Sequence, residues 1–271
     1  MPVHLELHKN LLLKWGHTIP LKPQHSPFRH APIIYGAKQQ FTHSPDTSPP
    51  LDATGVKRIQ AIIGSLLYYG GAVENKLLVA LSDLASTQAS ATDLTKTDLS
   101  QLLNYLSTYP EDGILYRSSA MILSAQYDAT YFNAPRARSR VGAHIMLSEN
   151  TPVPSPNGPV LTIAQIIKNV MSSAAEAELS GLFICAKAII PLRNTLIEMG
   201  WPQPSSTVQY DNSTATGKTN KTMVNKMIKS MDMRLWWLRC RYSQEHFRYY
   251  WAPGNKNLAY YSTKHHTPCI I

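Results

Sequence analysis

Hydrophobic residues recur at intervals of three and four through residues 51–112, a spacing that predicts helices with one buried face each. Three such stripes follow one another, and Asp52 stands where it can cap the first of them. The stripes are Ile59, Ile62, Ile63, Leu66 and Leu67, then Leu77, Leu78, Leu81 and Leu84, then Leu99, Leu102, Leu103 and Leu106. We expect a small helical segment over residues 51–112.

Residues 1–50 differ, because prolines and histidines replace most aliphatic residues from residue 16 onward. The stretches PLKPQHSPFRHAP and SPDTSPP disfavour helix, since proline lacks an amide donor and restricts the residue before it. The histidines show no compact ligand spacing, so they do not predict a metal site. We expect a Pro/His-rich extended or linker segment over residues 1–50.

After Gly113 the hydrophobic period shifts towards two, which predicts strands separated by turns. The expected strands cover residues 114–116, 121–127, 141–147, 160–163, 207–210 and 246–251, and the expected helices cover residues 173–190 and 213–241. Strands followed by alternating helices and strands are typical of a mixed α/β domain. We therefore expect an α/β domain over residues 113–271.

Three acidic residues fall where a catalytic site would hold them. Asp128 ends the expected strand MILSAQYD and Asp211 ends TVQYD, and sites commonly lie at the carboxyl ends of strands. Glu178 shares a helix face with Leu182, where a lone buried charge needs a partner. Each acid alone is more often structural, as strand-end aspartates often form turns. Together they predict a shared divalent-metal site.

Glu176 receives a different interpretation from Glu178. It stands three residues after Ser173 and completes an S-x-x-E capping box. Its side chain points about 200° around the helix from that of Glu178. We interpret Glu176 as a cap and Glu178 as the metal ligand.

The chain carries 26 Lys and Arg residues against 17 Asp and Glu residues, a formal charge of +9. This excess favours polyanionic partners, although a basic soluble protein without such a partner is an equal alternative. The three cysteines lie far apart and form neither a disulfide framework nor a zinc-binding pair. No apolar stretch reaches membrane-spanning length. We expect an intracellular protein, cytoplasmic or nuclear, without a membrane partner.

Basic residues are concentrated between residues 218 and 241, where Asp232 is the single acid. We expect four lysines there, Lys218, Lys221, Lys226 and Lys229, to contact phosphates, with a solvated surface as the alternative. We expect Trp236 and Trp237 to turn into the core rather than stack on bases. Three arginines alternate further upstream and would project one way from an extended segment, lining the same groove or decorating a loop; they are Arg136, Arg138 and Arg140.

Several motifs, in order, resemble the C-terminal part of the Pol polyprotein of copia-type LTR retrotransposons. They are KRIQAIIGSLLYYGGAV, QYDATYF around Asp128, RARSRVGAHIML, SSAAEAEL around Glu178, QYDNSTA around Asp211 and Asn212, SMDMRLWWLRCR, FRYYWAPGNKNLA and NLAYYSTKHH. The first resembles the helix that follows the polymerase palm, and the last resembles the LADxxTK stretch of the ribonuclease H segment. The resemblance covers nearly the whole chain from about Tyr35.

This resemblance implies a ribonuclease-H-like domain, a mixed five-stranded sheet with flanking helices, preceded by the end of a reverse transcriptase. Asp128, Glu178 and Asp211 would ligate two magnesium or manganese ions and hydrolyse the RNA strand of RNA–DNA hybrids. Asn212 and the basic residues above would contact the nucleic acid. The remainder of a Pol polyprotein is a further candidate partner.

Two departures from the family pattern change the expectation. Tyr260 stands at the family's fourth acid, and a phenol is a poor magnesium ligand, so the second ion would be held weakly. No YxDD-type motif precedes the helices, so no polymerase activity is expected. We keep three hypotheses: an impaired ribonuclease, an inactive relic that at most binds nucleic acid, and a host-recruited interaction module.

Overall fold

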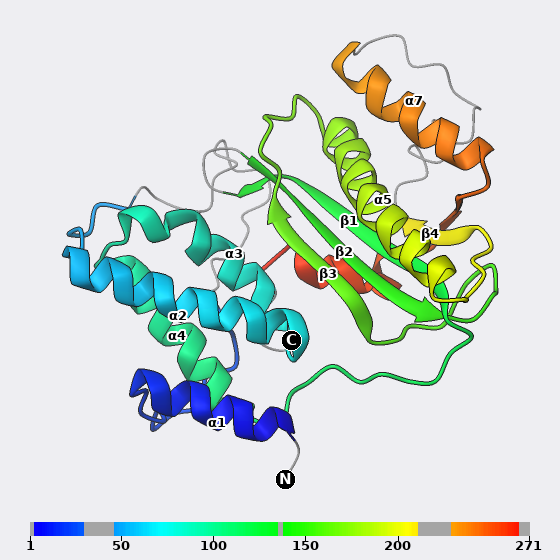
Figure 1. The fold of residues 1–271 in the computed structure, drawn as a ribbon. Coiled ribbons are helices and arrows are strands. Elements are labelled where there is room, and N and C mark those ends of the chain that lie inside the picture. Colours follow the sequence, from blue (N-terminus) through cyan, green and yellow to red (C-terminus); the bar gives the residue numbers. More distant parts are fainter. Residues whose placement is uncertain (1–2, 30–45, 135–137, 211–228, 266–271) are drawn as a thin grey trace. The chain divides into compact units, whose positions relative to one another are not determined.

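The computed structural model describes residues 3–29, 46–134, 138–210 and 229–265 (Figure 1). The chain divides into two compact units. We call residues 1–114 with 264–271 the helical unit, and residues 115–263 the sheet unit. Across the described ranges, no helix has the length and apolar character needed to span a membrane.

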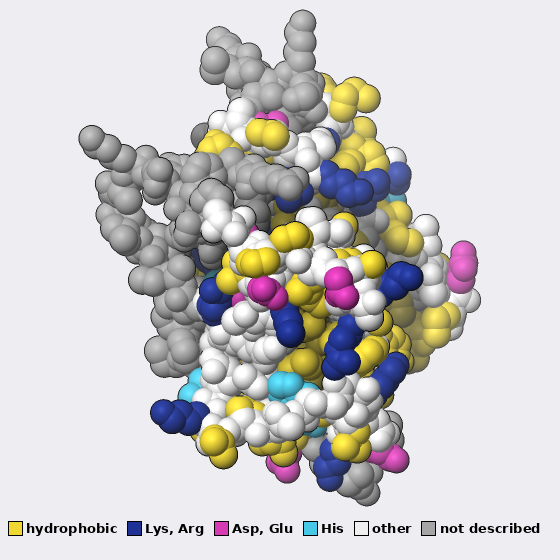
Figure 2. Space-filling view, turned by 90° about the vertical axis from the view of Figure 1, so that its left-hand side faces the viewer, with side chains coloured by type: hydrophobic (Ala, Val, Ile, Leu, Met, Phe, Trp, Pro, Cys, Tyr) yellow, Lys and Arg dark blue, Asp and Glu magenta, His cyan; other side chains and the backbone are white. Residues whose placement is uncertain are grey.

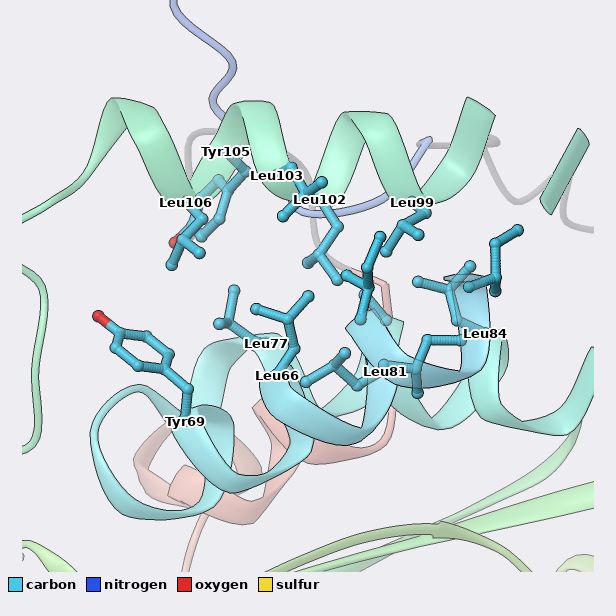
Figure 3. Close-up of a cluster of buried hydrophobic side chains, with 14 of the residues drawn as sticks. Leu66, Tyr69, Leu77, Leu81, Leu84, Leu99, Leu102, Leu103, Tyr105 and Leu106 are labelled. Atoms are coloured by element: carbon cyan, nitrogen blue, oxygen red, sulfur yellow. The ribbon is translucent and has the colours of Figure 1, made fainter. Parts of the chain in front are cut away.

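The helical unit contains the three helices that the apolar stripes predict. Its elements are α1 (Val3–Trp15), α2 (Ala53–Ala72), η1 (Asn75–Leu77), α3 (Leu78–Thr87), η2 (Gln88–Ser90) and α4 (Asp93–Thr108). Asp52 caps α2 as expected, because its Oδ1 accepts a hydrogen bond of 2.8 Å from the Gly55 amide. Leucine and tyrosine side chains from α2, η1, α3 and α4 meet in one core (Figure 3).

Helix α1 corrects the expectation that residues 1–50 are extended throughout. Leu11 and Leu12 of α1 are buried in the core of the helical unit, and this packing stabilises a helix that ends before the first proline of the Pro/His-rich stretch. Residues near the end of the chain also belong to this unit. His265 stacks on Phe28 with ring centroids 3.9 Å apart, and its Nε2 lies 2.8 Å from Oδ2 of Asp83.

The sheet unit has a mixed five-stranded sheet with the strand order β3-β2-β1-β4-β5. The strands are β1 (Ile122–Ala134), β2 (Arg138–Ser148), β3 (Pro159–Ile166), β4 (Ser206–Tyr210) and β5 (Phe247–Trp251). β1, β2 and β3 are antiparallel, whereas β4 is parallel to both β1 and β5. The helices are α5 (Ala174–Glu198) and α7 (Lys229–Ser243), followed by the short turns η3 (Gly254–Lys256) and η4 (Leu258–Ser262). The prediction of a mixed five-stranded sheet with flanking helices is confirmed.

Two strand predictions were wrong in their bounds. Residues 114–116 form no strand, because no neighbouring strand pairs with them, and Leu115 and Tyr116 are exposed. β1 is longer than expected, because its antiparallel pairing with β2 continues through Asp128↔Gly142 and Thr130↔Arg140. Asp128 therefore lies inside β1 and not at its end.

The two faces of the sheet differ in chemistry. On one face, Leu123, Ala125 and Tyr127 of β1 pack against α5, as Figure 1 shows for the two elements. Side chains alternate along a strand, so Gln126 and Asp128 point to the other face, where η3 and η4 lie. The sheet thus separates an apolar core from a polar layer.

A buried carboxyl group lies between α2 and η1 in the helical unit. Glu74 is 2% exposed, and its carboxylate oxygens are shielded from solvent. Burial, with a smaller contribution from the charge of Asp112, raises the pKa of Glu74 to about 8. The charge of Lys76 and a hydrogen bond with Tyr105 oppose this shift only in part.

We expect Glu74→Gln to remove a pH dependence of the stability of the helical unit. The pKa of the carboxyl rises from 4.5 to about 8 on folding, so the native state retains a proton that the unfolded chain releases. The stabilisation is complete below the lower value and is lost as the pH rises to the higher one, by about 1.4 kcal/mol per pH unit. Urea unfolding between about pH 5 and about pH 9 measures this slope.

Glu111→Gln is the matched control, because Glu111 is a nearby but exposed glutamate. It should keep the slope of the wild type. A slope that is the same in the wild type and in Glu74→Gln contradicts the assignment of the titrating group to Glu74.

Candidate metal and nucleic-acid site

The polar face of β1 is covered by residues 254–263, which we call the C-terminal strap. Asn257 Nδ2 donates a hydrogen bond of 2.8 Å to the Tyr127 carbonyl, and the Leu258 amide donates one of 2.9 Å to Gln126 Oε1. Gln126 Nε2 in turn donates to Gln209 Oε1 at 2.7 Å, which connects β1 to β4. These bonds satisfy buried polar groups and fix the strap on the sheet.

Asp128 lies under this strap and is 3% exposed. The hydroxyl of Thr263 donates a hydrogen bond to Oδ2 of Asp128. The Thr263 carbonyl is held in turn by Thr130 Oγ1 at 3.4 Å and by Asn133 Nδ2 at 2.6 Å. A buried carboxylate is costly without such partners, so the strap and Asp128 stabilise each other.

Gly142 permits the close approach of the strap. It pairs with Asp128 across the two strands, and a Cβ there would lie 2.6 Å from the Ala259 carbonyl oxygen and 2.8 Å from Thr263 Cγ2. Real Cβ atoms do not approach backbone oxygens so closely, and any side chain at this position would push the strap away.

Glu178 and Glu176 occupy the first turns of α5 as expected. Ser173 Oγ accepts a hydrogen bond of 3.2 Å from the Glu176 amide, which confirms the cap. The Glu176 carboxylate accepts from the amide and hydroxyl of Ser172, not from the amide of Ser173, so the box is shifted by one residue. Glu178 is half-buried, with one carboxylate oxygen shielded from solvent.

Tyr260 lies in η4, within the strap. Its carbonyl accepts a hydrogen bond of 3.1 Å from the Thr263 hydroxyl, the same hydroxyl that donates to Asp128. One side chain therefore contacts both the carboxylate of Asp128 and the backbone of Tyr260. The sequence did not single out Thr263, although it is the Thr of the LADxxTK-like stretch.

Several predicted site residues lie outside the described ranges. They are Arg136, Asp211, Asn212, Lys218, Lys221 and Lys226. Lys229 begins α7, and its side chain is likewise outside the description. The convergence of Asp128, Glu178 and Asp211 stays a prediction. Within the described ranges, no three or more His, Cys, Asp or Glu side chains gather as a metal site.

The described basic and aromatic residues divide into buried and exposed ones. Arg138 is half-buried, and Arg140 is 2% exposed, so Arg140 is not a surface contact for phosphates. Trp237 packs edge-on against Phe183, with centroids 5.3 Å apart, as a core interpretation requires. Trp236 is 61% exposed, which corrects the same expectation for that residue.

The donor chemistry of the remaining acids suits a divalent cation. Asp128 and Glu178 provide carboxylate oxygens, the hard ligands that magnesium and manganese prefer. The predicted third carboxylate ligand, Asp211, lies outside the described ranges.

No protein-family model and no curated protein sequence matches the chain. Among solved structures it is similar to an RNase H1 isolated from compost by a metagenomic approach, at 12% identity and a TM-score of 0.41, over 53% of this chain and 93% of that one. It is also similar to the N-terminal RNase H domain of a Mycobacterium tuberculosis protein, at 15% identity and a TM-score of 0.35, over 50% of this chain and 92% of that one.

A third similar structure is the foamy viral protease–reverse transcriptase in complex with double-stranded DNA. It has 14% identity and a TM-score of 0.46, over 77% of this chain and 39% of that one. At these identities no residue role carries over from these proteins to this chain.

We expect Gly142→Ala to loosen the strap. The added methyl group would overlap the Ala259 carbonyl, so amide hydrogen exchange in residues 257–263 should rise. Hydrogen exchange followed by mass spectrometry localises the effect. Gly181→Ala is the matched control, because its Cβ would meet the side chain of Ala129 at 2.9 Å on the α5 face. The control should accelerate exchange in α5 and leave the strap as in the wild type; equal protection of the strap in wild type and Gly142→Ala contradicts the packing argument.

Proposed function

We propose that this chain is a retrotransposon-derived ribonuclease-H-like domain of the copia type, preceded by the end of a reverse transcriptase. Its reaction would be the hydrolysis of the RNA strand of RNA–DNA hybrids, impaired by Tyr260. The observation that supports this best is the hydrogen-bonded link from Asp128 through Thr263 to Tyr260. This link supports a site on the polar face of the sheet in which Asp128 and Tyr260 take part.

The strand register supports the second aspartate of the proposed site. The last parallel pair between β1 and β4 is Gln126↔Gln209. Asp128 follows the first of these residues by two positions, and Asp211 follows the second by two positions. Asp128 and Asp211 therefore stand at equal sequence distances from one paired position.

The roles of the residues follow from their chemistry. When bound, divalent ions would activate the attacking water and stabilise the leaving oxygen. Asp128, Glu178 and Asp211 would hold these ions, and the strap would exclude bulk water from the buried side of Asp128. Tyr260 adds no charge, so it leaves the developing negative charge of the phosphate less well compensated than a carboxylate–metal pair would.

We expect Tyr260→Asp to raise the rate of hybrid cleavage by at least about tenfold, which corresponds to about 1.4 kcal/mol of barrier. Under the proposal, the substitution supplies the carboxylate ligand that Tyr260 lacks. Cleavage of a labelled RNA–DNA hybrid in magnesium or manganese measures it. Tyr261→Asp is the matched control, because it adds the same charge one residue away on an exposed side chain. Asp128→Asn should abolish cleavage both in the wild type and in the Tyr260→Asp variant. Cleavage that survives this change contradicts the assignment of the site.

A non-cleaving relic that binds nucleic acid is the second candidate, and the replacement of the fourth acid by Tyr260 favours it. α7 offers a surface for such binding. The Arg239 guanidinium lies 5.8 Å from the centroid of the Trp236 ring, and Arg241 lies 5.3 Å from that of Trp237. An exposed tryptophan beside arginines suits base stacking combined with phosphate contacts. On the face drawn in Figure 2, which is the left-hand side of Figure 1 and not the side of α7, Lys and Arg side chains lie among hydrophobic ones.

We expect Arg239→Gln to weaken the binding of an RNA–DNA hybrid, because it removes one phosphate contact. The slope of log K against log salt should fall in magnitude by about one. Fluorescence anisotropy over a range of salt concentrations measures both quantities. Arg117→Gln changes the charge equally at an exposed arginine of the sheet unit outside α7 and should keep the slope of the wild type. The same slope in wild type and Arg239→Gln excludes α7 from the binding surface.

A further inference from the structure

The side chain of Thr263 is fixed from several directions. Thr263 is fully buried, and its carbonyl accepts hydrogen bonds from Thr130 and Asn133 on β1. Its amide donates to the Tyr260 carbonyl at 3.3 Å. Its methyl group lies over Gly142, where the absent side chain leaves the space for it. The position of the hydroxyl is thus set by the strap and by strands β1 and β2.

That hydroxyl has two acceptors and one proton. Oδ2 of Asp128 and the Tyr260 carbonyl both lie within hydrogen-bond distance. A hydroxyl donates fully to one acceptor at a time, and a carboxylate is the stronger acceptor of the two when ionised. The donation to Asp128 also fixes the plane of the carboxylate, which otherwise turns easily about its terminal torsion.

We propose that Thr263 is a positioning residue, which fixes the orientation of the Asp128 carboxylate through Oδ2 for the binding of a divalent cation. This inference rests on the proposed function, because it needs Asp128 to be a metal ligand. It assigns a role to a residue that touches neither the cation nor the nucleic acid.

The loss of the fourth acid gives this role more weight. In a site with four acids, two ions fix the carboxylates from the solvent side. With Tyr260 in that place, the orientation of Asp128 depends more on its hydrogen bond from the protein. Hydrogen bonds to ligating carboxylates typically contribute about 10- to 100-fold to metal affinity.

The experiment is isothermal titration of Mn²⁺ into the full chain. Thr263→Val keeps the shape of the side chain and removes the donor, so the Kd for Mn²⁺ should rise by about tenfold or more. Thr263→Ser keeps the donor and should bind as the wild type does. Thr130→Val is the matched control, because it removes a hydrogen bond to the same strap residue without touching Asp128. Asp128→Asn reports whether the binding depends on the proposed site.

Each outcome has one meaning. Loss of affinity in Thr263→Val alone supports the positioning role. Equal loss in Thr263→Val and Thr130→Val overturns it, because strap packing would then be the cause. A third outcome is that Asp128→Asn abolishes Mn²⁺ binding and Thr263→Val leaves the affinity unchanged. This overturns the positioning role, while the metal site of the proposed function survives. Mn²⁺ binding that does not depend on Asp128 overturns the metal site itself, and the positioning role with it. Circular dichroism checks folding; if Thr263→Val does not fold, the comparison of Thr263→Ser with Thr263→Ala isolates the hydroxyl equally well.

Discussion

Hydrogen bonds between β1 and the C-terminal strap allow a central strand to keep polar side chains in a buried place. Gln126 and Asp128 lie in the middle of the sheet, where unsatisfied polar groups cost about 1–3 kcal/mol each. The strap supplies the Leu258 amide to one and the Thr263 hydroxyl to the other. Without these partners the polar face of β1 would have to be exposed or apolar. The candidate site exists because this face is both buried and polar.

The apolar face of the same strand explains why the arrangement is stable. Leu123, Ala125 and Tyr127 pack on α5, and this burial supports the sheet independently of the strap. Gly142 then serves only the polar side, where it leaves room for the backbone of η4. Stability and chemistry are divided between the two sides of one strand, so a change in the polar layer need not unfold the domain.

Periodicity predicted most strands and helices, because alternation and helical spacing are local properties of a chain. It failed where contacts with residues far away in the sequence determine the structure. Asp128 lies inside β1 because β2 continues to pair with it, and α1 forms because its leucines reach a core made by later helices. Trp236 is exposed, whereas the adjacent Trp237 is packed. The sequence of a basic run with aromatic residues does not show which of the two tryptophans is buried. Thr263, Gly142 and Asp128 come together only in the folded sheet, and no single-sequence pattern predicts such a three-way contact.

The helical unit is made of two pieces of chain that are separated by the whole sheet unit. Its last piece contributes His265, which stacks on Phe28 and contacts Asp83. During synthesis from the amino terminus, residues 3–114 therefore leave the ribosome long before this partner exists. Phe28 lacks this stacking partner until residues 115–263 have been made. The order of translation thus makes the sheet unit the first part of this protein that can complete its own contacts.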